Sequence, residues 1–220
     1  MKKLKLSLVI ALLGMASIVG AQNAFVNVKA GLNMSNFYGD NLSNKDVKPG
    51  FNIGVGVDLE FATNLSLQTG LYYTSKGAEY STSLPLDMND LKYDVTANYI
   101  QLPIHLAYKK NITQSAKLFF HAGPYMAYGI SGKRNMKSGF SNDKKQYFGE
   151  QEINTFDKKF GYKRWDMGVG LGVGAEFKKI VIDLGWDMGL MKTARNIESL
   201  PMYKPNMKNQ SAYLSVGFKF

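Results

Sequence analysis

The chain has 220 residues and a mass of 24.5 kDa, which suits one ordinary domain and is too small for a multidomain enzyme. It has no cysteine, which excludes disulfides, thiolate zinc sites, cysteine nucleophiles and the lipidated cysteine of a lipoprotein. With 2 histidines in the whole chain, we expect neither a metal site nor a bound cofactor. The formal net charge of +10 by itself fits a nucleic-acid-binding protein. Whether nucleic acid is a partner therefore depends on the compartment in which the protein resides.

The first 21 residues have the three parts of a secretory signal peptide. Lysines give a basic start, residues 6–18 form an apolar stretch of 13 residues, and small residues follow at 19–21. This stretch is shorter than the ~20 residues of a transmembrane helix, so we expect cleavage rather than anchoring. The sequence predicts a cleaved signal peptide over 1–21 and a mature domain over 22–220 that leaves the cytoplasm, which excludes nucleic acid as a partner.

The mature chain is dominated by alternation with a period of two. Between Phe51 and Phe61 every second residue is apolar, and between Trp165 and Phe177 the apolar residues alternate with four glycines and two acids. Such alternation is typical of strands with one apolar face and one polar or empty face. Eight segments of this kind follow one another, at residues 25–34, 50–61, 64–76, 93–108, 117–131, 163–177, 180–192 and 209–220.

The lengths of the segments and of their links indicate a membrane barrel. Most segments exceed the 5 or 6 residues of ordinary strands and reach the ~9–11 that cross a bilayer. The links at 62–63, 109–116 and 178–179 are short and the others are longer, up to 132–162, as in outer-membrane barrels with periplasmic turns and extracellular loops. We predict an all-β, eight-stranded antiparallel up-and-down transmembrane β-barrel. A hairpin within the longest loop would raise the number of strands to ten.

Aromatic residues on the apolar parity gather near both ends of the predicted strands, as the two interfacial girdles of a membrane barrel do. The alternative is a soluble barrel with its apolar parity turned inward around a ligand. The glycine-rich face of 165–177 disfavours that alternative, because it would leave the exterior almost without side chains. The two sets are Phe51, Tyr73, Tyr128 and Trp165 toward the long loops, and Phe61, Tyr108, Phe177, Phe218 and Phe220 toward the short turns.

Several spaced motifs together resemble the PorT-like outer-membrane β-barrel family. They are AGLNMS at 30–35, PGFNIG at 49–54, LSLQTGLYYTSKG at 65–77, YIQLPI at 99–104, GPY at 123–125 and the glycine-rich segment 166–177. The resemblance covers nearly the whole mature chain. It implies an outer-membrane barrel, and it suggests a link to protein secretion, because one member of that family is implicated in a secretion system.

Six ionisable residues fall on the inward parity in the periplasmic half of the predicted barrel, and they can pair across neighbouring strands. Buried charges need partners, so we interpret them as a structural lumen charge network that plugs the barrel. A proton or ion path is the alternative, since ionisable groups at membrane depth are often functional. Asp187, higher in the same lumen, has no evident partner. The six residues are Lys29, Asp58, Glu60, Glu176, Asp183 and Lys219.

The side chains that an enzyme would use also fall on the inward parity: His105, His121, Ser66, Ser211 and Ser215. An enzyme acting on membrane lipid needs its catalytic groups on the lipid-facing wall, where they meet an acyl chain. None of the serines lies in an oxyanion-type motif. We therefore predict hydrogen-bonded lumen histidines, with a lumenal metal site as the alternative, and a protein that is not an enzyme.

The loop 132–162 carries an excess of positive charge, including Lys133, Arg134, Lys137, Lys144 and Lys145. These residues are a candidate extracellular contact site for lipopolysaccharide phosphates or for an acidic partner protein. A solvated loop without a ligand and a β-structured extension above the membrane are the alternatives.

These observations favour a non-enzymatic outer-membrane barrel with a structural or accessory role in the envelope. The resemblance to the PorT-like family suggests that this role is linked to protein secretion. The alternative is a surface binding or adhesion barrel that acts through its extracellular loops, chiefly 132–162. We expect outer-membrane lipid and lipopolysaccharide as partners. The alternating last strand, which ends in Phe220, is expected to contact the barrel-insertion machinery. A large open pore is disfavoured because eight strands close around side chains.

Overall fold

The computed structural model describes residues 24–39, 45–83, 90–140, 146–156, 162–193 and 206–220, so the expected signal peptide lies outside the described residues. Within these ranges no helix is long and apolar enough to span a membrane. The strands are β1 (Ala24–Gly39), β2 (Lys45–Asp46), β3 (Lys48–Ala62), β4 (Leu65–Ser83), β5 (Asp90–Asn111), β6 (Ala116–Phe140), β7 (Gln146–Asn154), β8 (Trp165–Phe177), β9 (Ile180–Gly189) and β10 (Met207–Lys219).

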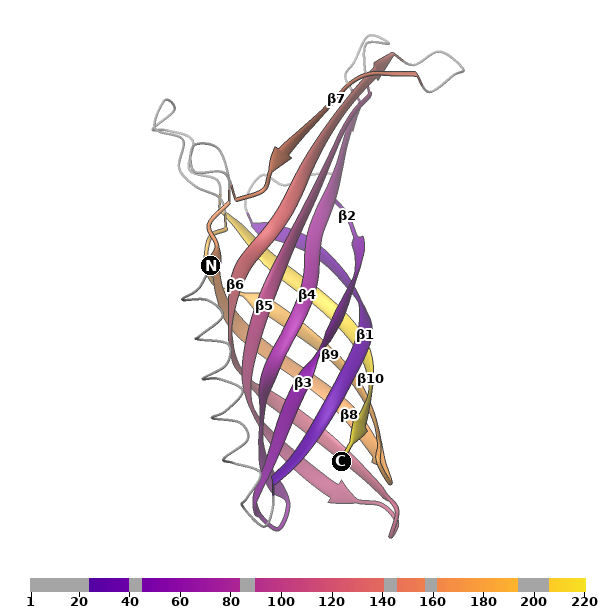
Figure 1. Cartoon of the computed structure of the whole chain (residues 1–220), viewed down its shortest axis with the longest axis vertical. Coiled ribbons are helices and arrows are strands. Elements are labelled where there is room, and N and C mark those ends of the chain that lie inside the picture. Colours follow the sequence, from indigo (N-terminus) through magenta and orange to yellow (C-terminus); the bar gives the residue numbers. More distant parts are fainter. Residues whose placement is uncertain (1–23, 40–44, 84–89, 141–145, 157–161, 194–205) are drawn as a thin grey trace.

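Eight of these strands form a closed antiparallel ring, in the order β1-β3-β4-β5-β6-β8-β9-β10 (Figure 1). The ring closes where β10 pairs with β1, for example Leu214 with Leu32. Closure leaves no free edge within the bilayer and satisfies the backbone hydrogen-bonding groups, which is what lets strands span lipid. The predicted eight-stranded up-and-down barrel is confirmed, and β2 and β7 are additions outside the ring.

The alternation in the sequence becomes the two faces of the barrel wall. In β8 the odd-numbered residues from Trp165 to Val173 are exposed, whereas Asp166, Gly168 and Glu176 are buried. Large apolar side chains such as Leu171, which is 53% exposed, therefore point away from the lumen. A soluble protein would bury these side chains, so the apolar exterior indicates contact with lipid.

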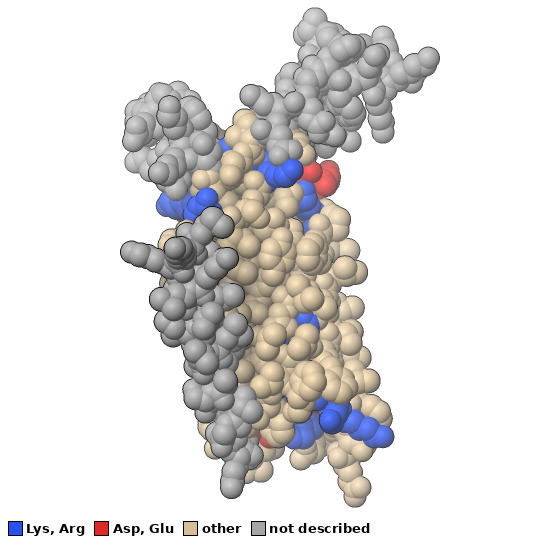
Figure 2. Space-filling model, viewed as in Figure 1, with Lys and Arg blue, Asp and Glu red and all other residues tan. Residues whose placement is uncertain are grey.

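The exposed aromatic residues lie in two bands. Toward the long loops, Phe51 packs on Tyr73 with ring centroids 5.5 Å apart, and Tyr128 packs on Trp165 at 5.0 Å. At the opposite end Phe218 packs edge-on against Phe220 at 5.2 Å. Figure 2 shows basic residues gathered near both ends of the visible face, with an almost uncharged band between them. This arrangement is that of a membrane barrel with two interfacial girdles.

The wall is taller on one side than the sequence alone indicated. Strands β4, β5 and β6 continue beyond the rest of the barrel on the long-loop side, and β7 lies beside the upper part of β6 (Figure 1). Residues 131–139 of β6 pair with 90–98 of β5, and 133–140 of β6 also pair with 146–154. The described parts of the segment 132–162 are therefore largely β-structured, which is the extension that the sequence left as an alternative.

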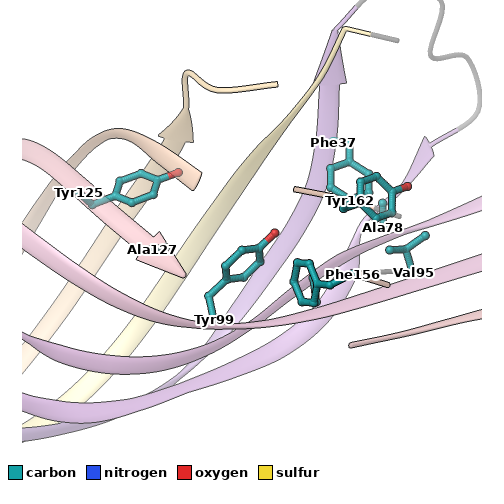
Figure 3. Packing of buried hydrophobic residues seen from close by; sticks show 9 residues of the cluster. Phe37, Ala78, Val95, Tyr99, Tyr125, Ala127, Phe156 and Tyr162 are labelled. Atoms are coloured by element: carbon teal, nitrogen blue, oxygen red, sulfur yellow. The ribbon is translucent and has the colours of Figure 1, made fainter. Parts of the chain in front are cut away.

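An apolar cluster fills the extracellular mouth of the lumen. Phe156 and Tyr162, which come from the segment between β7 and β8, lie against residues of the barrel strands (Figure 3). Tyr162 stacks on Phe37 with centroids 5.5 Å apart, and Phe156 meets Tyr99 edge-on at 5.8 Å. We call this set the mouth cluster: Phe37, Ala78, Val95, Ala97, Tyr99, Tyr125, Ala127, Phe156 and Tyr162.

The glycines of β8 make room for side chains that lean over them. A Cβ on Gly172 would lie 2.3 Å from Nε2 of His121, and one on Gly174 would lie 2.2 Å from the Phe119 ring. The sequence predicted a polar or empty face for this segment. The structure shows instead that side chains of the neighbouring β6 occupy the space, because a narrow barrel cannot hold large residues on two adjacent strands at one level.

Candidate functional site

The most elaborate group of polar residues in the described chain is the lumen, whose periplasmic half is filled by a charge network centred on Lys109. Its Nζ donates to Asp58, to Oε1 of Glu60 at 3.1 Å and to Oε1 of Glu176 at 2.7 Å. Lys219 lies 3.2 Å from Glu176 and 3.6 Å from Asp58. We call these five residues the lower network.

Lys109 was missed by the sequence analysis, which placed it in the turn 109–116. The structure extends β5 to Asn111, and Lys109 keeps the inward parity of His105 and Ala107. The same period-two pattern would have identified it if the strand had been continued by a few residues. Lys109 is needed here because two buried carboxylates and the half-buried Glu60 require more than the single ammonium of Lys219.

A second group, the histidine chain, crosses the middle of the lumen. Nζ of Lys29 donates to Oδ2 of Asp183 at 2.8 Å, and Oδ1 of Asp183 lies 2.9 Å from Nε2 of His121. Nδ1 of His121 lies 2.9 Å from Nδ1 of His105, and the two rings stack with centroids 5.0 Å apart. The six sequence-predicted network residues are thus divided between the lower network and this chain.

Asp187, for which the sequence offered no partner, is bound from two strands. Oδ2 accepts a hydrogen bond from Nε2 of Gln101 at 2.7 Å and lies 3.6 Å from Nζ of Lys76. Oδ1 of Asp187 and Nε2 of His105 have no partner among the described residues, and both point at the space beside Gly170. A carboxylate oxygen and a ring nitrogen around one small space form a place for a water molecule, which can both donate and accept hydrogen bonds.

The polar lumen ends directly below the mouth cluster. Oδ2 of Asp166, whose residue is fully buried, accepts from Nδ2 of Asn209 at 2.9 Å and from the Tyr125 hydroxyl at 3.3 Å. Nδ2 of Asn209 also lies 3.4 Å from the Tyr99 hydroxyl. The two tyrosines therefore belong to both layers, with their rings in the mouth cluster and their hydroxyls on the polar groups below.

Free space remains in the lumen beside the histidine chain. A cavity of about 70 Å³ lies beside the histidine chain and is lined by polar groups that include Asn52, Tyr72 and Tyr213. This volume holds a few water molecules, since one water needs ~10–15 Å³. In the part of the chain that is described, no group of three or more histidine, cysteine, aspartate or glutamate residues is placed to hold a metal ion.

The candidate catalytic side chains are not arranged for nucleophilic catalysis. Ser66, Ser211 and Ser215 are buried in the lumen, and Ser215 donates to Oδ1 of Asn52 at 3.0 Å. The two histidines bond to each other and to Asp183, and neither is hydrogen-bonded to a serine. A serine nucleophile requires such a contact with its base, so the geometry offers no acyl-transfer site among the described residues.

The candidate contact residues of the segment 132–162 have different positions. Lys133, Arg134 and Lys137 lie on the upper part of β6, whereas Lys144 and Lys145 lie outside the described residues. Arg134 is buried, donates from Nη2 to the Asn154 carbonyl at 3.3 Å and lies over the Tyr162 ring at 5.9 Å. Arg134 thus stabilises the extension, and this limits its availability for a ligand.

The fold and lumen define the chain as a small transmembrane β-barrel of the outer membrane. Residues 20–195 match the family model described as outer membrane protein beta-barrel domain, and the chain belongs to this family. It is an integral protein of the outer membrane. No curated protein matches the chain.

Solved structures similar to the chain are also outer-membrane barrels. Ail of Yersinia pestis, in complex with the heparin analogue sucrose octasulfate, has 14% identity and a TM-score of 0.41, with 90% of this chain and 100% of that chain covered. OprG of Pseudomonas aeruginosa has 12% identity and a TM-score of 0.46, with 91% and 98% covered. The protease OmpT of Escherichia coli has 10% identity and a TM-score of 0.44, with 90% and 96% covered.

Proposed function

We propose that the protein is a non-enzymatic, closed barrel with a structural or accessory role in the outer membrane. The observation that carries this proposal is the filling of the lumen. The lower network joins four strands by ion pairs, namely β3, β5, β8 and β10, and the mouth cluster covers the polar lumen from the other end. We expect a barrel of this size, with side chains filling both ends of its lumen, to anchor and present its extramembrane parts and not to conduct solutes.

Conductance in planar lipid bilayers tests the closed lumen. We expect the purified mature protein to give no stable single-channel currents of porin size. Stable currents of porin size from the wild type would contradict the proposal. Unchanged lipid A and phospholipid profiles on overexpression are expected for a non-enzyme, and a new lipid product would contradict that part.

An accessory role in protein secretion is the finer proposal, supported by the resemblance of motifs such as 65–77 and 99–104 to the PorT-like family. A deletion strain of the native host should then lose a defined set of proteins from the culture supernatant, while total synthesis of these proteins is unchanged. Complementation with the wild-type chain should restore them. An unaltered set of proteins in the supernatant would exclude the role in secretion and leave only the structural role.

The second candidate function is binding at the cell surface. It is favoured by the extension, in which β4, β5 and β6 continue beyond the rest of the barrel and β7 adds a strand. Deletion of residues 137–158 should abolish surface binding to host cells or matrix while the barrel still folds. Folding is measured by gel mobility of unheated against boiled protein, because closed membrane barrels resist detergent until heated. Binding that survives this deletion would exclude the extension as its site.

A further inference from the structure

A row of lysines lies at the extracellular rim, on the side of the barrel opposite the tall wall. Lys163 precedes β8, Lys192 follows β9 and Lys208 lies in β10. Backbone hydrogen bonds join the three segments at this level, since Lys163 N donates to Thr193 O at 2.7 Å and Thr193 N donates to Met207 O at 2.7 Å. The three lysines are therefore neighbours across adjacent segments, although they are far apart in the sequence.

The side chains of these lysines lie outside the lumen. Lys163 and Lys192 are exposed, whereas Tyr162 and Thr193 beside them are buried. In β10, Lys208 precedes the buried Asn209, and successive strand residues point to opposite faces. Lys208 itself is half-buried over the Tyr38 ring at 5.6 Å from its centroid.

The row lies at the level of lipid headgroups. Trp165, which is 53% exposed and packs on Tyr128, follows Lys163 by two residues on the same face. Leu190, also 53% exposed, precedes Lys192 by two residues. Tryptophan and tyrosine mark the membrane interface, and two strand residues span ~7 Å. The ammonium groups are therefore just outside the hydrocarbon, where phosphate groups lie.

Among the described residues, no acid is paired with the row. All acids of β8, β9 and β10 are buried in the lumen, namely Asp166, Glu176, Asp183 and Asp187. On the other side of the barrel, by contrast, Lys48 of β3 is paired with Asp94 of β5. Uncompensated ammonium groups next to a membrane surface attract anionic headgroups.

We propose that Lys163, Lys192 and Lys208 form a binding surface for the phosphate groups of lipopolysaccharide in the outer leaflet. This inference goes beyond the closed-barrel function and does not depend on it. It also lies below the contact residues that the sequence suggested, because Lys133 and Lys137 are on the extension above the rim. The site fixes the depth and rotational setting of the barrel among its lipids.

The test uses the full chain, expressed with its own N-terminal segment into the outer membrane of a lipopolysaccharide-containing host. The protein is purified in mild detergent, and native mass spectrometry counts the bound lipopolysaccharide. The variant K163Q/K192Q/K208Q should lose most of it. The matched control is K110Q/K178Q/K179Q, because Lys178 and Lys179 also lie over girdle aromatics, Phe177 and Phe218, but at the other end of the barrel. The control should retain the wild-type amount.

Added-back ligands identify the chemistry. Delipidated wild type should bind lipopolysaccharide more tightly than lipopolysaccharide stripped of its lipid A phosphates, or than phosphatidylglycerol. Each lysine changed to glutamine should weaken binding about fivefold, since one lysine near an anionic surface contributes about 1 kcal/mol. The charge-preserving K163R/K192R/K208R should bind as the wild type does.

Three outcomes would overturn the proposal. The triple glutamine variant could retain as much lipopolysaccharide as the wild type, or the control variant could lose as much as the triple variant. The third is that the wild type binds dephosphorylated lipopolysaccharide or phosphatidylglycerol as tightly as intact lipopolysaccharide. The heat-dependent gel shift verifies folding of every variant. If the triple variant does not fold, the three single variants replace it, and an unchanged affinity in all of them would overturn the proposal equally.

Discussion

The lower network and the mouth cluster fill two ends of one lumen with opposite chemistry. The lower network consists only of barrel-strand residues, and each of its main ion pairs crosses the lumen between strands that are separated by one strand of the ring. The mouth cluster is apolar and takes Phe156 and Tyr162 from a segment outside the ring. Strand closure therefore fixes the lower network, whereas the mouth cluster also depends on two residues from outside the ring. Charge pairing in the lower network therefore supports the barrel itself, and apolar packing in the mouth cluster closes its entrance.

The largest effect is expected from removing the centre of the lower network. Lys109→Met leaves Asp58, Glu60 and Glu176 with Lys219 as their main counter-charge. Breaking a buried pair on one side costs about 3–5 kcal/mol, so the free energy of unfolding in lipid vesicles should fall by about that amount. It is measured by urea titration.

Lys110→Met is the matched control for this change, because Lys110 is the next residue of β5 and is exposed. It should alter the free energy of unfolding by about 0.5 kcal/mol or less. If both variants unfold alike, the lower network is not what stabilises the barrel.

The next effect concerns the pair of Lys29 and Asp183 in the histidine chain. Each single change, Lys29→Met or Asp183→Asn, should destabilise the barrel by about 2–3 kcal/mol, because a buried charge loses its partner. The double variant should be more stable than the sum of the single effects predicts, by about 1–3 kcal/mol. A urea-unfolding double-mutant cycle measures this coupling. Simple additivity would show that the 2.8 Å contact carries no net energy.

Phe156→Ala should have a smaller effect, about 1–2 kcal/mol, although such truncations in sealed cores cost ~3–5 kcal/mol. The difference arises because the segment that carries Phe156 can detach locally while the ring stays closed. Limited proteolysis should cut this segment faster in Phe156→Ala than in Phe156→Leu, while the heat-dependent gel shift is unchanged in both. Loss of the gel shift in the alanine variant would show that the mouth cluster also supports the barrel.

The smallest effect is expected from the part-buried pair of Lys48 and Asp94, whose side chains are 13% and 42% exposed, so that the aspartate remains in contact with water. Exposed ion pairs contribute about 0–1 kcal/mol. Lys48→Gln should therefore lower the free energy of unfolding by less than about 1 kcal/mol, and the difference should shrink further in high salt. A larger or salt-independent change would place this pair with the buried groups.

The sequence alone determined the barrel, the strand number and which face of each strand meets lipid. It could do so because alternation with period two is a local property, and because short and long links report on which side each strand ends. It also identified the inward charges, since parity assigns Lys29, Asp58 and Asp183 to the lumen without any knowledge of the contacts.

Only the tertiary structure decided which of these charges meet. Lys29 pairs with Asp183, 154 positions away, because closure of the ring sets the register between β1, β10 and β9. Closure also brings Lys109 among three carboxylates and Lys76 toward Asp187. The height of β4 to β6 and the packing of Phe156 were likewise decided in three dimensions. Pairing between strands and packing against a distant segment depend on register and curvature, which a local pattern does not contain.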